Sequence, residues 1–388
     1  MKKKKSSHAK KAGKHQKSRD GLSPHVLISG YYGFDNLGDE LILKVLTDEL
    51  KAKGVKITVL SNNPRKTATQ YDVQSIHRMN FIDIIDALSR ANAFISGGGG
   101  LFQDATGPAS PLYYGGLIHL AHFFEVPVCF WAQGVGPLNH SLSRKVTASA
   151  LHKCESIVVR DEQSARLIEE ISGLEVEATA DPVWLLKLPK KPPALKASGK
   201  DKRGKKSGKQ ATPWRLGVSL RPWGALSEQH LTHLRNLFQQ IAEQSNKPVE
   251  LLLLPFQKQE DTHLLQTFTR NIQSSTLSVR MIPPEEVLVQ FQTCDAILGM
   301  RFHSLILGLL AKLPVYGLIY DPKVDNLLRM FNLPGCRIEE IENLTADVLQ
   351  TAFSQAQNVD LSPLKKESRR NFKILNQLLN IPEAELVR

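Results

Sequence analysis

Short apolar runs alternate along most of the chain with longer stretches that carry apolar residues at helical spacing. Apolar runs of this length predict buried strands, and apolar residues three and four positions apart predict one face of a helix. Strands that alternate with helices form parallel sheets with right-handed crossovers. The pattern therefore predicts an α/β fold.

The predicted strands fall into two blocks of similar length. They lie at 25–29, 56–60, 93–96, 127–131, 156–160 and 175–179 in the first block, and at 215–220, 249–254, 279–281, 295–299 and 315–320 in the second. Helices are predicted between most of these strands, among them 41–51, 227–244, 260–271 and 285–292. A final helix is expected near 363–380, with a return onto the first block as one option.

A chain of 388 residues is longer than a single hydrophobic core usually grows, so two domains are expected. A segment rich in Lys, Gly, Ser and Pro separates the two blocks and marks the boundary. We therefore expect a disordered basic tail over 1–24, an N-terminal Rossmann-like domain over 25–186, a Lys-rich linker over 187–213 and a C-terminal Rossmann-like domain over 214–388. The two domains are expected to face each other across a cleft.

The net charge of +12 is concentrated in the tail and the linker. The first 20 residues carry nine Lys or Arg and one Asp, and residues 187–210 carry ten Lys or Arg and one Asp, so the rest of the chain is slightly acidic. Neither segment interleaves aromatic residues for base stacking, and nucleic acid is not an expected partner. Solubilising sequence is the simplest interpretation. Attraction to an anionic membrane, at about 1 kcal/mol per basic residue, is the alternative.

The four cysteines show no CxxC or metal-ligand spacing and are expected to be reduced core residues. No apolar segment typical of a signal peptide follows the basic start. The longest apolar run is interrupted by Lys312 and Pro314, which argues against a membrane span. We expect a cytoplasmic protein, with the inner face of the plasma membrane as a further option.

Glycine-rich segments follow three of the predicted strands, where open α/β sheets bind their ligands. In the first, over 30–38, an anion site at a helix start and a tight turn with Asp39 near the cap are equally good interpretations. In the second, over 97–100, four consecutive glycines each cost roughly 0.5–1 kcal/mol relative to alanine in a regular element, which favours a ligand loop. The third, over 133–136, is as compatible with a plain turn.

Two basic side chains and a histidine gather at successive strand ends of the second block. Arg301 and His303 alternate about Phe302, so in extended backbone they share one face. Lys323 follows the next strand, and its neutralisation by Asp325 is the structural alternative. A histidine beside an arginine at a helix start is a candidate acid–base group.

Three further residues follow predicted strands. Arg160 ends a strand of the first block and offers a bidentate anion donor, or else forms a surface pair with Asp161 or Glu162. Trp223 at a strand end suits either stacking on a sugar or packing at a hinge. Asp181 is compatible with a turn or with an acceptor that fixes a base, and the turn is the preferred interpretation.

At these residues the chain resembles the polysaccharide pyruvyl transferase family (CsaB-type). The matching segments follow in order through nearly the whole folded chain: Gly30-Tyr-Tyr-Gly-Phe-x-Asn36-x-Gly38-Asp-Glu40, Gly97-Gly-Gly-Gly-Leu-x-Gln-Asp104, Ala132-Gln-Gly-Val-Gly-Pro137, Val159-Arg-Asp161, Ala180-Asp-Pro182, Gly299-Met-Arg-x-His303 and Tyr320-Asp-Pro-Lys323.

The resemblance implies a GT-B-like fold and transfer of a pyruvyl group from phosphoenolpyruvate to two hydroxyls of a sugar, forming a ketal. It implies an acceptor in a cell-surface or cell-wall polysaccharide, for example an S-layer anchor, or in its lipid-linked precursor. We expect neither a metal nor a cofactor beyond phosphoenolpyruvate as co-substrate. The expected catalytic residues are His303, Arg160 and Lys323; the donor-binding residues are Arg301, Gly97, Gly98, Gly99, Gly100 and Ser304; the acceptor-binding residues are Asn36, Asp39, Gln103 and Trp223.

Two other functions fit the same pattern. A GT-B glycosyltransferase that uses a nucleotide-sugar would have similar glycine-rich turns. A non-catalytic glycan-binding or anion-binding scaffold, recruited to membranes by the basic segments, would need no acid–base group at His303.

Overall fold

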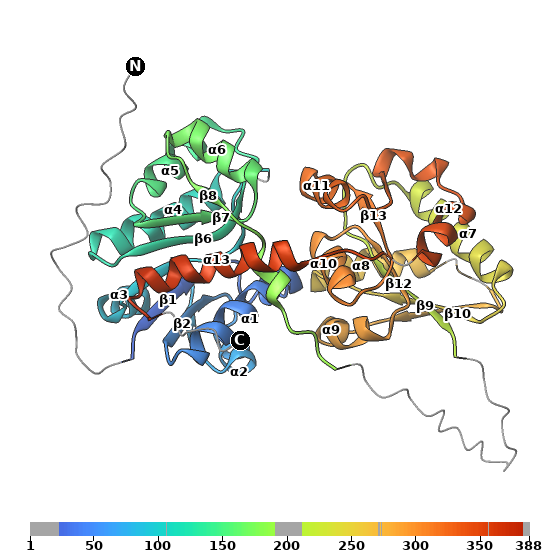
Figure 1. Cartoon of the computed structure of the whole chain (residues 1–388), viewed down its shortest axis with the longest axis horizontal. Coiled ribbons are helices and arrows are strands. Elements are labelled where there is room, and N and C mark those ends of the chain that lie inside the picture. The colour runs from blue at the N-terminus through green and yellow to red at the C-terminus, as the bar shows by residue number, and fades with distance from the viewer. Residues whose placement is uncertain are drawn as a thin grey trace, which may run out of the picture.

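The computed structural model describes residues 23–190 and 212–382, except residues 106, 271, 273 and 356. Most of the expected basic tail (1–24) and of the Lys-rich linker (187–213) lies outside the described residues. The described residues form two α/β halves that lie next to each other (Figure 1).

The first half is built on an eight-stranded parallel sheet with the order β3-β2-β1-β4-β6-β7-β8, and β5 pairs with β6. Its strands are β1 (His25–Ser29), β2 (Lys56–Ser61), β3 (Gln74–His77), β4 (Ala93–Ser96), β5 (Gly99–Phe102), β6 (Val128–Val135), β7 (Ser156–Val159) and β8 (Glu177–Ala178). Its helices are α1 (Leu37–Ala52), α2 (Pro64–Tyr71), α3 (Phe81–Arg90), α4 (Ala109–Phe123), α5 (Ser141–Leu151), α6 (Glu162–Ser172) and the 3₁₀ turn η1 (Pro182–Leu185).

The second half repeats this scheme with a six-stranded parallel sheet in the order β11-β10-β9-β12-β13-β14. Its strands are β9 (Trp214–Ser219), β10 (Val249–Leu253), β11 (Leu277–Met281), β12 (Ala296–Gly299), β13 (Val315–Ile319) and β14 (Gly335–Arg337). Its helices are α7 (Glu228–Gln244), α8 (Lys258–Thr269), η2 (Pro284–Glu286), α9 (Val287–Gln290), η3 (Phe291–Thr293), α10 (Phe302–Leu310), α11 (Pro322–Met330), η4 (Ile338–Asn343) and α12 (Ala346–Ser354). Both sheets have the strand order of a Rossmann-like domain.

Side chains alternate between the two faces of each central strand, so each sheet has an apolar cluster on both sides. In β1, Val26 and Ile28 belong to one cluster and Leu27 to the other. The largest cluster extends through both halves, because it joins residues such as Ile42 of α1 to Ile306 of α10. The two halves are therefore packed against each other through apolar side chains.

Backbone contacts also join the halves at the start of α1. Asn36 and Gln257 form an isolated antiparallel bridge, and the Leu37 amide donates to the Phe256 carbonyl at 2.7 Å. The Gln257 side chain donates to the Phe34 carbonyl at 3.1 Å. The loop before α1 is thus fixed to the second half rather than free in solvent.

The last described helix, α13 (Ser362–Leu378), returns to the first half and lies across it (Figure 1). It packs on η1, β6 and β7. In the chain this helix falls in the range assigned from sequence to the C-terminal domain (214–388), whereas in space it covers the N-terminal sheet. Its buried face contains Asn371, Phe372 and Leu375, and the Phe372 ring meets the ring of Trp131 edge-on.

Two sequence expectations need correction at the strand ends. The segment 97–100 is not only a loop, because Gly99–Phe102 forms β5 beside β6. The strand predicted at 127–131 continues to Val135, so Gln133 and Gly134 lie inside β6 rather than in a turn. Among the described helices, none is long and apolar enough to cross a membrane.

Candidate active site

Arg160 of the first half and His303 of the second half meet at Asp181, near the carboxyl ends of the two sheets. Arg160 directly follows β7, and Asp181 directly precedes η1 in the first half. His303 lies in the first turn of α10, and Lys323 lies in the first turn of α11 in the second half. The parallel strands bring these residues to one edge of each sheet.

Asp181 holds the Arg160 guanidinium in place. Arg160 Nη1 donates to Asp181 Oδ2 at 3.0 Å, and Arg160 Nε lies 3.7 Å from Asp161 Oδ2. The guanidinium also lies against Gly134, where a Cβ atom would overlap it. The contact of Arg160 with Asp161, the structural alternative to anion binding, is therefore secondary to a buried pair with Asp181.

His303 faces the first half across the contact between the two halves. Its Nε2 lies 3.4 Å from Asp181 Oδ2, which makes an ion pair when the imidazole is protonated. Its Nδ1 lies against Gly38, where a Cβ atom would overlap the imidazole. The ring is thus held between Gly38 and Asp181.

Asp181 carries the negative charge that joins these cations. Burial alone would raise its pKa, but His303 and Arg160 lower it to about 2. Asp181 Oδ1 also accepts from the Val183 amide at 2.9 Å, which caps η1. The preferred interpretation of Asp181 as a turn residue is therefore incomplete, because the same carboxylate positions two candidate catalytic side chains.

Arg301 is bound to a carboxylate that the sequence analysis did not single out. Its Nε donates to Asp261 Oδ2 at 3.0 Å, and its Nη2 donates to Asp261 Oδ1. Asp261 is fully buried and also accepts from the Phe256 and Gln257 amides. No sequence signal marked Asp261, because an acidic residue in a first helical turn is ordinary.

Ser304 is buried, and its hydroxyl donates to the Arg301 carbonyl at 2.6 Å. Together, Arg301 and Ser304 shape the turn that presents His303. Lys323 lies above the Tyr320 ring and 3.4 Å from Asp321 Oδ2, with about a third of its side chain exposed. It pairs with Asp321, whereas Asp325, the partner in the structural alternative, pairs with Arg329.

Close neighbours leave no room for side chains at several positions of the glycine run 97–100. A Cβ atom at Gly97 would overlap the Tyr32 hydroxyl, and one at Gly98 would overlap Ile42. Gly99 has a φ of +99° and lies against the Asp39 carboxylate, while Gly100 has open space around its Cα. Close packing therefore accounts for glycine at positions 97 and 98 without a ligand. Their donor-binding role stays a prediction.

The expected acceptor-binding residues have different surroundings. Asn36 caps α1 by accepting from the Gly38 amide at 3.1 Å, and Gln103 accepts from the Ala105 amide at 2.9 Å. Trp223 is 42% exposed and meets the Tyr320 ring edge-on. Asp39 lies in the first turn of α1, and burial raises its pKa to about 7 in spite of nearby cations.

Arg221 is a further cation at this edge that the sequence-based site did not include. It follows β9, lies over the rings of Tyr320 and Trp223, and donates to the Tyr320 hydroxyl at 3.3 Å. Its Nε is buried without a partner among the described residues. Its position directly after a strand was the available signal.

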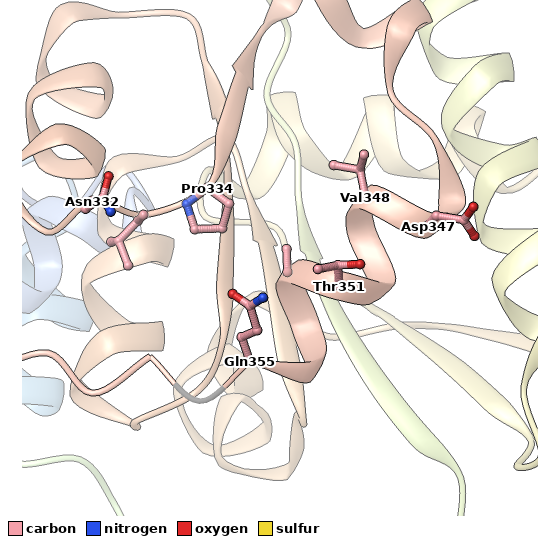
Figure 2. Close-up of a pocket in the computed structure, with 8 residues that line it drawn as sticks. Asn332, Pro334, Asp347, Val348, Thr351 and Gln355 are labelled. Carbon is pink, nitrogen blue, oxygen red and sulfur yellow. The ribbon is translucent and has the colours of Figure 1, made fainter.

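A separate depression lies in the second half between the residues before β14 and helix α12 (Figure 2). Its lining residues are Asn332, Leu333, Pro334, Asp347, Val348, Thr351, Ala352 and Gln355. None of the predicted site residues borders it. Within the described ranges, no group of three His, Cys, Asp or Glu side chains is arranged to hold a metal ion, and the absence of a metal stays a prediction.

The fold is shared with enzymes of nucleotide-sugar metabolism. The UDP-GlcNAc 2-epimerase of Methanocaldococcus jannaschii superposes with a TM-score of 0.59 at 11% identity, over 92% of this chain and 100% of that one. The structure of S. aureus MnaA with UDP superposes with a TM-score of 0.59 at 11% identity, over 93% of this chain and 98% of that one. The UDP-GlcNAc 2-epimerase of Neisseria meningitidis superposes with a TM-score of 0.57 at 10% identity, over 92% of this chain and 100% of that one. At these identities the likeness establishes the GT-B-like fold alone.

The sequence itself matches none of the curated proteins compared with it. The family description "Polysaccharide pyruvyl transferase", by contrast, matches residues 36–322, from the N-cap of α1 to the start of α11. This range includes Arg160, Asp181 and His303. The chain therefore belongs to the polysaccharide pyruvyl transferase family.

Proposed function

We propose that the protein transfers the pyruvyl group of phosphoenolpyruvate to two hydroxyls of one sugar in a cell-surface or cell-wall polysaccharide, or in its lipid-linked precursor, with formation of a ketal. The observation that carries the proposal is the Asp181 carboxylate, which holds Arg160 of one half and lies beside His303 of the other. A fixed cation and an acid–base group at one place are what phosphoenolpyruvate chemistry needs.

Phosphoenolpyruvate carries a phosphate and a carboxylate, so its site needs several fixed cations. Arg160 is buried and held by Asp181, and Lys323 is partly exposed at the first turn of α11. Arg301 is held in place by Asp261, to which its Nε and Nη2 donate. Positions fixed before the substrate binds stabilise developing charge without reorganisation.

Ketal formation also needs a proton on the enol carbon while the phosphate departs. His303 suits this transfer because its Nε2 lies 3.4 Å from the Asp181 carboxylate, which pairs with the protonated imidazole, at the contact between the halves. A positioned acid–base side chain contributes about 10²–10⁴ to a rate. No resident cofactor enters this scheme, since phosphoenolpyruvate is the co-substrate.

Phosphate release tests the proposal. The protein would be incubated with phosphoenolpyruvate and a panel of sugar acceptors, and phosphate and the pyruvylated product would be followed by a colorimetric assay and mass spectrometry. We expect His303→Asn to lower kcat about 10²–10⁴-fold. The exposed His152 offers a control, and His152→Asn should leave turnover unchanged.

Two outcomes would contradict the proposal. Tight binding of a nucleotide-sugar, with no phosphate released from phosphoenolpyruvate by any acceptor, would favour a glycosyltransferase. Ligand binding that is unchanged in His303→Asn, with no turnover in the wild-type chain, would favour a non-catalytic scaffold.

We also propose that the enzyme works at the inner, anionic face of a membrane, where lipid-linked precursors are available. The support is the charge of residues 1–20, which carry nine Lys or Arg. Basic residues near an anionic surface each contribute about 1 kcal/mol to binding.

A further inference from the structure

Asp39 differs from the other carboxylates around the site in its hydrogen bonding. Among the described residues, none donates a hydrogen bond to its carboxylate, whereas the adjacent Glu40 accepts from the Gly33 amide at 2.8 Å and from the Tyr71 hydroxyl. Asp181 and Asp261 are likewise bound by arginines and backbone amides. The neighbouring carboxylates fix backbone amides and arginine side chains by hydrogen bonds, and Asp39 has no such structural role among the described residues.

The backbone places Asp39 beside the candidate catalytic groups. Its Oδ1 lies against Gly99, and this contact leaves no room for a side chain there. The preceding residue, Gly38, lies against the His303 imidazole. Asp39 and His303 therefore belong to opposite halves, and His303 contacts the residue that directly precedes Asp39 in the first turn of α1.

Charged and titratable groups from several elements surround Asp39. Arg160 after β7 and Lys323 of α11 lower its pKa, whereas Glu40 of α1 and Asp181 before η1 raise it. The largest influence is burial, and the net result is a pKa of about 7. Tyr31, Tyr32 and Tyr114 also lie within the influence of its charge. Perturbed carboxyl groups of this kind cluster at functional sites.

We propose that Asp39 is the base that takes the proton from the attacking acceptor hydroxyl, while His303 supplies the proton to the enol carbon of phosphoenolpyruvate. The assignment rests on the proposed function and divides its acid–base work between the two halves. It makes Asp39 a catalytic residue rather than only an acceptor-binding one.

The proton balance closes with these two groups. The first hydroxyl oxygen bonds to C2 as Asp39 takes its proton, and the electron pair of the C2–C3 double bond takes a proton from His303 to form the methyl group. The C2–O bond to phosphate then breaks, and the phosphate leaves with the proton from Asp39. The second hydroxyl oxygen bonds to C2, and its proton returns to His303. The products are the ketal and hydrogen phosphate, and both side chains regain their starting states.

The pH dependence has a defined sign. A base must be deprotonated to act, so kcat with saturating substrates should fall about tenfold per pH unit below the pKa of Asp39. In Asp39→Asn we expect kcat to fall about 10²–10⁴-fold, this acidic limb to disappear from the residual rate, and KM for phosphoenolpyruvate to stay within about threefold. Asp48→Asn, which changes an exposed carboxylate of the same helix, should keep the wild-type profile.

Thermal stability gives a second measurement that does not depend on turnover. Since the pKa of Asp39 is higher in the folded chain than in the unfolded chain, the stability that Asp39 contributes is lost as pH rises from about 4 to about 7. Asp39→Asn should therefore have the wild-type Tm at pH 4 and a higher Tm at pH 8. A lower Tm at pH 8, or failure to fold, would identify a structural carboxylate and overturn the assignment.

The outcomes separate the two proposals. A wild-type chain that releases phosphate, with Asp39→Asn within threefold of its kcat and with the same acidic limb, overturns only the role of Asp39. A wild-type chain that releases no phosphate with any acceptor overturns the proposed function, and the role of Asp39 falls with it.

Discussion

A single carboxylate, Asp181, connects the two halves of the site at the residue scale. It receives Arg160 at 3.0 Å, lies 3.4 Å from His303 Nε2 and accepts from the Val183 amide. Removing one partner of a buried ion pair leaves the other charge uncompensated, which costs more than an exposed pair contributes. Loss of Asp181 should therefore affect both folding and catalysis.

The stability effect of Asp181 has a sign that follows from its pKa. Its pKa is lowered to about 2 in the folded chain, so its contribution is complete above the unfolded value of about 3.8 and is lost as pH falls toward 2. We expect Asp181→Asn to lower the free energy of unfolding by about 2–3 kcal/mol at pH 7. Urea denaturation at pH 7 and at lower pH would measure the difference, which should shrink below pH 4.

The matched control for Asp181 is Asp347, an exposed carboxylate that borders the depression in the second half. Asp347→Asn should change the free energy of unfolding by less than about 0.5 kcal/mol. If the two variants lose equal free energy of unfolding, the contacts of Asp181 with Arg160 and His303 do not stabilise the folded chain.

The residue types of the site were accessible from sequence, but their partners were not. Arg160, His303 and Lys323 stand out because they follow predicted strands. The pairs Arg301–Asp261 and His303–Asp181 join residues 40 and more than 100 positions apart. Local periodicity carries no information about such contacts, which depend on how the strands and halves assemble.

At the scale of elements, strands with strong apolar patterns agree with the structure and weakly apolar ones were missed. The predicted strands at 25–29, 56–60 and 93–96 match β1, β2 and β4 within one residue. The strand β3 was missed because its residues, Gln74–His77, are polar or half-exposed at the edge of the sheet. The strand β5 was missed because glycines indicate a loop when their packing partners are unknown.

Helix α13 reaches the loop that carries Asp181. Asn371 donates to the Ala180 carbonyl at 2.8 Å and accepts from the Thr179 hydroxyl, while Ser368 donates to the Asp181 carbonyl at 2.8 Å. The Trp131 indole donates to the Asn371 carbonyl. The helix thus fixes the backbone on which the shared carboxylate sits.

We expect Asn371→Ala to lower the free energy of unfolding by about 1–3 kcal/mol, since it leaves buried polar groups unsatisfied. Because the loop before η1 would lose two of its hydrogen bonds, kcat should also fall, with a smaller change in KM. Differential scanning calorimetry and phosphate release would measure both effects. Arg369→Ala, an exposed position of the same helix, is the control, and equal losses in both variants would contradict this role.

At the scale of the whole molecule, the basic residues of the N-terminal segment 1–20 lie outside the part of the chain that matches the family. The sheets and helices carry the family match, whereas nine of the Lys and Arg lie within residues 1–20. The two parts should therefore be separable by mutation.

Replacing the nine Lys and Arg of residues 1–20 by Gln should abolish most binding to phosphatidylserine vesicles, since each basic residue contributes about 1 kcal/mol. Turnover of a water-soluble acceptor should stay within about twofold of wild type. Vesicle co-sedimentation at low and high salt would measure binding, with phosphatidylcholine vesicles as the control. Equal binding of both chains to anionic vesicles would refute the membrane role of the tail.

The return of α13 to the first half has a consequence for how the protein is made. Asn371 follows its partner Trp131 by 240 residues. At about 5–20 residues per second, a ribosome needs roughly 10–50 s to add that length. During this interval the newly made first half exposes Trp131 and its neighbours, so a chain that stops after the linker retains an uncovered apolar face. Truncated products should therefore aggregate or bind chaperones, even though their own sheet is complete.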